Sequence, residues 1–289
     1  MSEPISTPIA TTSTAKAWAP DIVTFPAADV VPDLLLLQCS TVAGSIQGDE
    51  PALRVPYIDD DSATFVAEGA EIDEAEPTLS EITVHTAKLA QLVRVSREQY
   101  LQSGTAGMLS DSMRRAVTNA ANTAFLGQTA PTPPAVAPPA GLTNITGVTP
   151  GGDVDGDLDA LVDAIAGISA AGGNPSHVLL SPTAWANLRK LKSGTGSAQS
   201  LLGAGTTDAA ASLLGVPTLV TGALTGSSGL VIDKSAVVSA VGNIEVAVSQ
   251  DAFFQSDSVG VRVTLRAGWN VVRPERLVAF DVVDPDAAG

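Results

Sequence analysis

The sequence has few of the residues on which catalytic and oxidative chemistry depends. Its 289 residues include one cysteine, Cys39, and two histidines, His85 and His177. A lone cysteine cannot form an internal disulfide, and its place after a run of leucines predicts a small buried hydrophobe. No G-x-S-x-G, P-loop or G-x-G-x-x-G motif occurs, and neither histidine has a partner at a spacing typical of a catalytic pair. The sequence therefore predicts that the protein is not an enzyme and carries no cofactor.

Long hydrophobic runs and positive charge are also scarce. No run approaches the roughly 18 consecutive apolar residues of a membrane-spanning helix, and no secretory signal precedes the first basic residue, Lys16. These absences predict a protein that is soluble and intracellular when synthesised, with no membrane partner. The formal net charge of −16 argues against affinity for nucleic acid, because phosphate contacts need lysine and arginine. Charged residues make up only 16% of the chain, which favours a subunit that hides much of its surface against copies of itself.

A dense acidic segment stands out in what the chain does contain. Residues 53–58 predict the outgoing strand of a hairpin and residues 63–70 the returning strand. Arg54 is the only basic residue among the carboxylates of this region, which are Asp49, Glu50, Asp59, Asp60, Asp61, Glu68, Glu71, Asp73, Glu74, Glu76 and Glu81. The segment is either a solvated face or a cation site, although no calcium-ligand spacing recurs in it.

A long strand and a long helix follow the acidic segment. Apolar residues alternate from Leu79 to Val95, and the alternation changes phase near Ala87 and Lys88, which predicts a bulge or bend in one strand. The helix is predicted from Met108 to Leu126. Its apolar stripe consists of Leu109, Met113, Val117, Ala120 and Ala124.

Residues 153–159, DVDGDLD, resemble a calcium-binding loop in composition only. An EF-hand loop needs glycine at its sixth position and glutamate at its twelfth, and here Leu158 and Ala164 occupy those positions. The stronger interpretation is a helix that begins here, with Asp155 or Asp157 as its cap. Calcium binding at these residues stays an open alternative. Further on, Ser181 and Pro182 form a typical helix start after a strand at residues 176–180.

Several stretches occur in an order that resembles a known family. They are FVAEGAEI at residues 65–72, EITV at 81–84, LVRVSRE at 92–98, SPTAW at 181–185 and GVRVTLRAGWNVVRPERLVAFDV at 260–282. Together they resemble the major capsid proteins of tailed double-stranded DNA phages. The resemblance implies an α+β fold of the Hong Kong 97 type, with an N-terminal arm, an extended hairpin called the E-loop, a peripheral domain containing a long spine helix, and an axial domain. The corresponding residues are 1–45 for the arm, 46–78 for the E-loop, 79–130 and 241–272 for the peripheral domain, and 131–240 and 273–289 for the axial domain.

This resemblance also implies a function. The chain is expected to self-assemble into pentamers and hexamers that form an icosahedral shell around the phage genome, without binding the DNA specifically. The shell would be part of the virion and would assemble in the cytoplasm of the bacterial host, with decoration, scaffolding and portal proteins as further partners. An encapsulin-type shell that encloses cargo enzymes shares this fold and is the alternative.

Candidate contact residues between subunits follow from charge. In the family the E-loop lies over the peripheral domain of an adjacent subunit, so its carboxylates need a cationic surface opposite them. The carboxylates are Glu68, Glu71, Asp73, Glu74 and Glu76, and the candidate cations are Arg94, Arg97, Arg114, Arg115, Arg262 and Arg266. The alternative is that Phe65, Val66 and Ile72 hold the arm through apolar contacts.

The sequence predicts a shell without covalent links between subunits. Some members of the resembled family join a lysine on the E-loop to an asparagine of a neighbour, but no lysine lies between Lys16 and Lys88 here. Assembled particles boiled in denaturant should therefore run as one band near 29.2 kDa on a denaturing gel. A ladder of covalent multimers would contradict this prediction.

Overall fold

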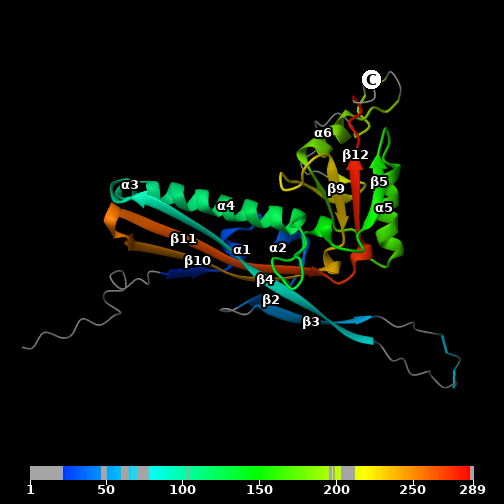
Figure 1. Cartoon of the computed structure of the whole chain (residues 1–289). Coiled ribbons are helices and arrows are strands. Elements are labelled where there is room, and N and C mark those ends of the chain that lie inside the picture. Colours follow the sequence, from blue (N-terminus) through cyan, green and yellow to red (C-terminus); the bar gives the residue numbers. More distant parts are fainter. Residues whose placement is uncertain are drawn as a thin grey trace, which may run out of the picture.

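Two β-sheets and their covering helices make up the protein (Figure 1). The structure is a computed structural model that describes residues 22–46, 51–59, 65–66, 68–69, 78–102, 104–194, 197, 199–202 and 212–286. The larger sheet forms a long, flat body, and the smaller sheet stands at one end of it. No helix in these residues is long and apolar enough to cross a membrane.

The larger sheet is built around three long antiparallel strands. Its order is β1-β10-β11-β4-β3, and β2 pairs with β10 in parallel. The bounds are β1 Ile22–Phe25, β2 Thr41–Ile46, β3 Ala52–Asp59, β4 Thr78–Ser96, β10 Val237–Phe253 and β11 Ser258–Val271. The strand predicted at 53–58 is confirmed as β3, but its partner is the first half of β4. The return strand expected at 63–70 is wrong at its described residues, because 65–66 form no strand and 68–69 form a turn; the other four residues lie outside the described part of the chain.

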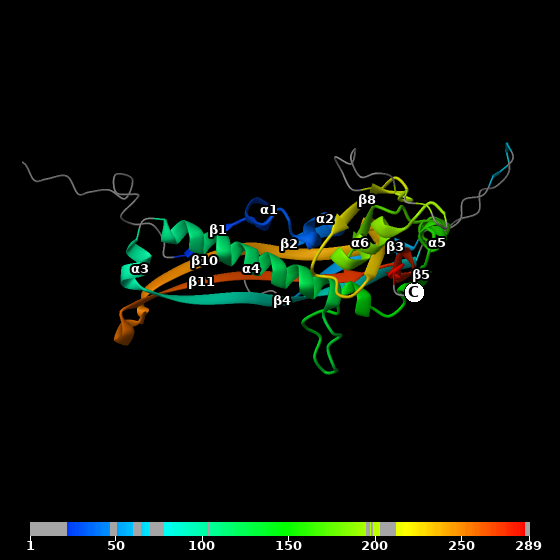
Figure 2. The ribbon, with the colours of Figure 1, turned by 90° about the horizontal axis from the view of Figure 1, so that it is seen from above.

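The helix α4, Thr105–Gly127, runs along one face of this sheet (Figures 1 and 2). Its buried side chains are Met113, Val117, Ala121, Phe125 and Leu126, which contact the apolar side chains of β10 and β11 in one continuous core. The predicted stripe is therefore wrong at one position, because Ala120 is exposed and Ala121 is buried. Successive residues of a helix are about 100° apart, so only one of these two neighbours can face the sheet. The short helices α1 Ala27–Val30, α2 Leu35–Cys39 and α3 Arg97–Leu101 cover the rest of this face or its end.

The change of phase in β4 is real, but no bulge causes it. The pairing of β4 with β11 runs without a register shift from Thr86 to Ser96. Up to that point Val84 packs with Ile46 and Val238 in a small separate cluster. Beyond it the opposite face of β4 is covered, because Leu89 and Val93 pack in the core beneath α4. The buried face changes because different elements cover the two halves of the strand.

The smaller sheet has the order β5-β12-β9-β6-β8-β7. Its strands are β5 Thr149–Val154, β6 His177–Leu180, β7 Ser212–Leu213, β8 Val216–Val220, β9 Ser228–Ile232 and β12 Leu277–Val282. Two helices pack on it, α5 Asp159–Ala170 and α6 Pro182–Lys190. The predicted cap of α6 is confirmed, since the Ser181 hydroxyl accepts the Ala184 N–H at 3.0 Å. The predicted cap of α5 is displaced by one residue: Leu158 holds the cap position without a side-chain hydrogen bond, while the Asp157 carboxylate accepts the N–H of Asp159, the first residue of the helix, at 3.1 Å.

The chain crosses between the sheets three times: once from α4 to β5 through residues 128–148, and twice through single-turn helices. The chain passes from β9 through η2, Lys234–Ala236, into β10, and from β11 through η4, Pro274–Arg276, into β12. Asp233 and Arg276 stand beside these two passages and form an ion pair at 3.7 Å, with side chains only 4% and 14% exposed. The remaining short helices are η1 Leu142–Asn144 and η3 Phe254–Ser256.

Hydrogen bonds extend this ion pair into a small network. Arg276 Nε donates to the carbonyl of Ala171, at the end of α5, at 3.1 Å. The Asp233 carboxylate accepts the N–H groups of Asn174 and Ser235 at 3.1 and 2.9 Å. The network therefore joins the η2 and η4 passages to α5 and to the start of β6.

Replacing Arg276 by methionine should destabilise the fold strongly. The Asp233 carboxylate would stay buried without its cation, and removing one partner of a buried pair costs about 3–5 kcal/mol. Chemical denaturation of the purified subunit measures the change. The matched control is Arg54→Met, which breaks the exposed Arg54–Glu81 pair at 3.3 Å. An exposed pair is worth about 0.2–1 kcal/mol, so equal losses in the two variants would contradict the assignment.

Candidate assembly surfaces

The face of the larger sheet that α4 leaves uncovered carries a row of cations. Lys88 of β4 lies opposite Arg266 of β11, and Arg262 lies opposite Leu92. Arg94 is on the same face, because alternate residues of a strand point to the same side. We call this surface, consisting of Lys88, Leu92, Arg94, Arg262 and Arg266, the basic face. Glu245 of β10, opposite Thr264, places one carboxylate beside it.

Some side chains of the basic face make contacts within the chain, and others are exposed. Arg266 is half-buried and donates to the Thr86 hydroxyl at 3.2 Å. The guanidinium carbon of Arg94 lies 5.1 Å from the centre of the Phe253 ring, in a cation–π contact. Arg262 is exposed, and Leu92 is 61% exposed between the cations. This surface is thus cationic with an apolar centre, a composition that suits an acidic segment with its own apolar residues.

Arg97 is at the far end of the sheet and has a partner within the chain. Its Nε lies 2.7 Å from the Asp257 carboxylate, in the turn between β10 and β11. Its backbone N–H also donates to the Asp257 carbonyl at 3.0 Å. Arg97 therefore closes the tip of the sheet and does not belong to the basic face.

Arg114 and Arg115 lie on α4, on the other side of the molecule from the basic face. Arg114 is 4.0 Å from Asp111, one helical turn earlier. Arg115 is exposed and lines a shallow hollow with Asp33 and Asn122. The six candidate arginines are thus divided among a sheet face, a tip and a helix.

The acidic partner of this surface is described only in part. Glu68 is exposed, and Phe65 is fully exposed beside the half-exposed Val66. The other predicted contact residues of the E-loop lie outside the described residues; they are Glu71, Ile72, Asp73, Glu74 and Glu76. The part of the arm near the body is the β3–β4 pair, which projects beyond the sheet (Figure 1).

Two of the basic-face residues were missed in the sequence. Lys88 and Leu92 have the same strand parity as Arg94, so the two-residue period of β4 was a signal for them. The change of phase near Ala87 and Lys88 hid this signal, because a bulge or bend there leaves the face of Lys88 undetermined. An unbroken strand keeps all three side chains on one face.

The groups with perturbed pKa values form no reactive site. Burial raises the pKa of the Cys39 thiol to about 12, so it stays protonated. Burial, together with the nearby Lys234, lowers the pKa of His177, whose Nδ1 contacts the Ser176 hydroxyl. The hydrogen bonds that Lys190, at the end of α6, donates to the carboxylates of Asp286 and Asp284 raise its pKa. In the described residues no group of three or more His, Cys, Asp or Glu side chains could hold a metal ion, and residues 153–159 are among them.

Comparison with known proteins identifies what this architecture is. The phage capsid family matches residues 36–282. A solved structure from Gordonia phage Cozz is 16% identical, with 98% of each chain covered and a TM-score of 0.65. The capsid of an empty GTA particle is 20% identical over 86% of this chain and 90% of that chain, with a TM-score of 0.66. A structure from Mycobacterium phage Ogopogo is 17% identical over 86% and 92% of the two chains, with a TM-score of 0.62. No curated protein matches the chain by sequence.

These matches confirm the α+β fold of the Hong Kong 97 type and do not favour the encapsulin-type alternative. The family match includes α4, the whole smaller sheet and every strand of the larger sheet except β1. The chain therefore belongs to the phage capsid family and is a major capsid shell protein that assembles with copies of itself.

Proposed function

We propose that copies of this chain form pentamers and hexamers that close an icosahedral shell around a double-stranded DNA genome. The observation that carries this proposal is the basic face, a cationic surface that α4 leaves open on the larger sheet. Support comes from the GTA capsid relatives, whose structures were computed with C5 symmetry. The shell encloses the DNA without specific contacts, because a net charge of −16 repels phosphate.

The two sheets support a division of labour within the subunit. The larger part of β4, β10 and β11, with α4, belongs to the peripheral domain proposed at 79–130 and 241–272, and the smaller sheet with α5 and α6 belongs to the axial domain proposed at 131–240 and 273–289. Residues 46–78 form the E-loop, and residues 1–45 form the N-terminal arm. The Asp233–Arg276 network lies where the two domains join and supports a fixed angle between them.

The E-loop of one subunit contacts the basic face of its neighbour. The carboxylates Glu68, Glu71, Asp73, Glu74 and Glu76 supply the negative charge, and Arg94, Arg262 and Arg266 supply the positive charge. One exposed pair is worth only about 0.2–1 kcal/mol, but the contact recurs at every interface of a closed shell. Salt screens charges over about 8 Å at physiological ionic strength, so assembly should weaken as salt rises. Arg114 and Arg115 lie on α4, away from the basic face, so we assign them to contacts other than the one with the E-loop.

Other partners and the place of assembly follow from the same function. A shell held without covalent links gains from decoration proteins, needs a scaffolding protein to set its size, and admits DNA through a portal. Assembly takes place in the cytoplasm of the bacterial host. The subunit performs no catalysis in this role, since self-association is its whole task.

Reversing the charge of the E-loop should block assembly without unfolding the subunit. The Glu71→Lys/Glu74→Lys variant places cations against the basic face, and we expect soluble subunits in place of shells. Electron microscopy and sedimentation velocity measure the particle yield, and circular dichroism checks the fold. Normal shells at low salt would show that the apolar Phe65, Val66 and Ile72 hold the arm instead.

A charge swap provides the matched control. The Arg94→Glu/Arg262→Glu variant alone should also fail to assemble, and combining it with Glu71→Lys/Glu74→Lys should restore particles. A second control, Asp155→Lys/Asp163→Lys, changes the net charge equally at exposed positions of the smaller sheet. If this control blocks assembly as strongly as the arm variant, net charge and not docking would be the cause.

A further inference from the structure

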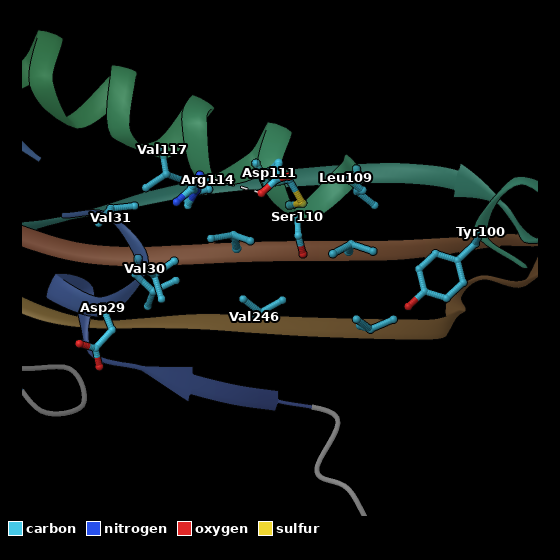
Figure 3. Close-up of a pocket in the computed structure, with 15 residues that line it drawn as sticks. Asp29, Val30, Val31, Tyr100, Leu109, Ser110, Asp111, Arg114, Val117 and Val246 are labelled. Carbon is cyan, nitrogen blue, oxygen red and sulfur yellow. Dashed lines mark ion pairs between the residues drawn. The ribbon is translucent and has the colours of Figure 1, made fainter. Parts of the chain in front are cut away.

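An apolar groove runs between α4 and the β10 side of the larger sheet (Figure 3). It encloses about 460 Å³, large enough for a bulky aromatic side chain with neighbours. Its floor is formed by apolar residues of β10 and β11, namely Ile244, Val246, Val248, Val261 and Val263. Its walls are Val30 and Val31 on one side and Leu109, Met113 and Val117 of α4 on the other, with Tyr100 at the far end.

Within the described part of the chain, this groove is left half-covered. Val246, Val248, Leu109 and Tyr100 are all half-buried, although they belong to or border the main core. Among the described residues, β1 pairs with the β10 edge from Ile22 opposite Ala247 to Phe25 opposite Ile244. Covering the exposed part of these valines with another apolar group removes apolar surface from water and is therefore favourable.

The described chain begins at the mouth of this groove. Ile22 is opposite Ala247, whose neighbours Val246 and Val248 line the floor. Twenty-one residues precede Ile22, and the aromatic one among them is Trp18. A chain of four residues spans at most about 14 Å, which is enough to bring Trp18 from Ile22 to Val246 and Val248, the neighbours of Ala247 on β10. Trp18 can therefore reach the groove from the same chain.

We propose that Trp18 occupies this groove in its own subunit and anchors the start of the N-terminal arm. An indole ring supplies a large apolar area at a small cost in side-chain entropy. Lys16 is the one cation of residues 1–21, and the exposed carboxylate of Asp29 stands at the rim of the groove. The short connection gives the segment a high effective concentration at its own groove, which favours this occupant over the same segment of another copy.

Anchoring at Trp18 gives the N-terminal arm a defined starting point. Residues 1–14 then leave each subunit from the same place, whatever their later contacts are. This inference concerns the single chain and does not depend on the charge contact proposed for the E-loop.

Tryptic cleavage after Lys16 in the purified full-length chain tests the proposal. Docking of Trp18 protects this bond, and cleavage follows the undocked fraction, so Trp18→Ala should speed cleavage by about tenfold or more. Trp18→Phe keeps an aromatic ring and should stay within about threefold of the unchanged chain. Ile5→Ala, farther from the groove, is the matched control and should change nothing. Each rate is divided by that of a peptide of residues 1–21 with the same substitution, which removes the preference of the protease itself.

A variant of the groove and a dilution series complete the test. Val246→Asp should speed cleavage as Trp18→Ala does, whereas Val162→Asp on the exposed face of α5 should not. The Trp18 variants keep the test decisive if Val246→Asp does not fold. Protection should be independent of protein concentration, and its loss on dilution would assign the groove to a neighbouring copy and overturn the proposal. Equal cleavage of the Trp18→Ala and unchanged chains would also overturn it, and would leave the groove to an external partner.

Discussion

Burial of one face of β4, β10 and β11 under α4 is the interaction on which the rest of the structure depends. These are the three longest strands of the protein, and a single helix of 23 residues covers much of their inner face. The edge-to-face contact of Phe125 and Trp269, with ring centres 5.5 Å apart, is part of this core. Because one helix covers one side only, the other face of the sheet stays open. That open face is where Lys88, Arg94 and Arg262 lie, so the packing that stabilises the subunit also creates its candidate assembly surface.

The second constraint is the way the two sheets share the chain. Two of the three connections between them run through η2 and η4, and the buried Asp233 and Arg276 join these two connections. A buried ion pair contributes little net stability compared with apolar packing, but it is costly to break. Its position therefore favours a fixed relation between the sheets. A shell made of many copies needs this property, because a small change of angle in one subunit is repeated at every contact.

Sequence periodicity was sufficient to predict the elements with one buried face. The helix at 108–126 and the strands at 53–58 and 79–95 are present, and the helix extends a few residues further at its N-terminal end. The prediction from periodicity was wrong where different elements pack against the two halves of one strand. The phase change at Ala87 looked like a bulge, although different elements cover the two halves of an unbroken strand. The choice between Ala120 and Ala121 could not be made either, because alanines fit both faces of a helix.

The sequence by itself determined the residue types of the assembly surface, which are the carboxylates of an E-loop without lysine and scattered arginines. It also determined that no known catalytic motif is present. Its ordered motifs also determined the fold family. Only the tertiary structure decided which of the arginines share a surface. Strand register placed Arg94, Arg262 and Arg266 together, the tip turn paired Arg97 with Asp257, and α4 carried Arg114 and Arg115 to the other side. The physical reason is that these residues are far apart in the chain. Their proximity follows from the pairing of β4 with β11, which local periodicity does not encode.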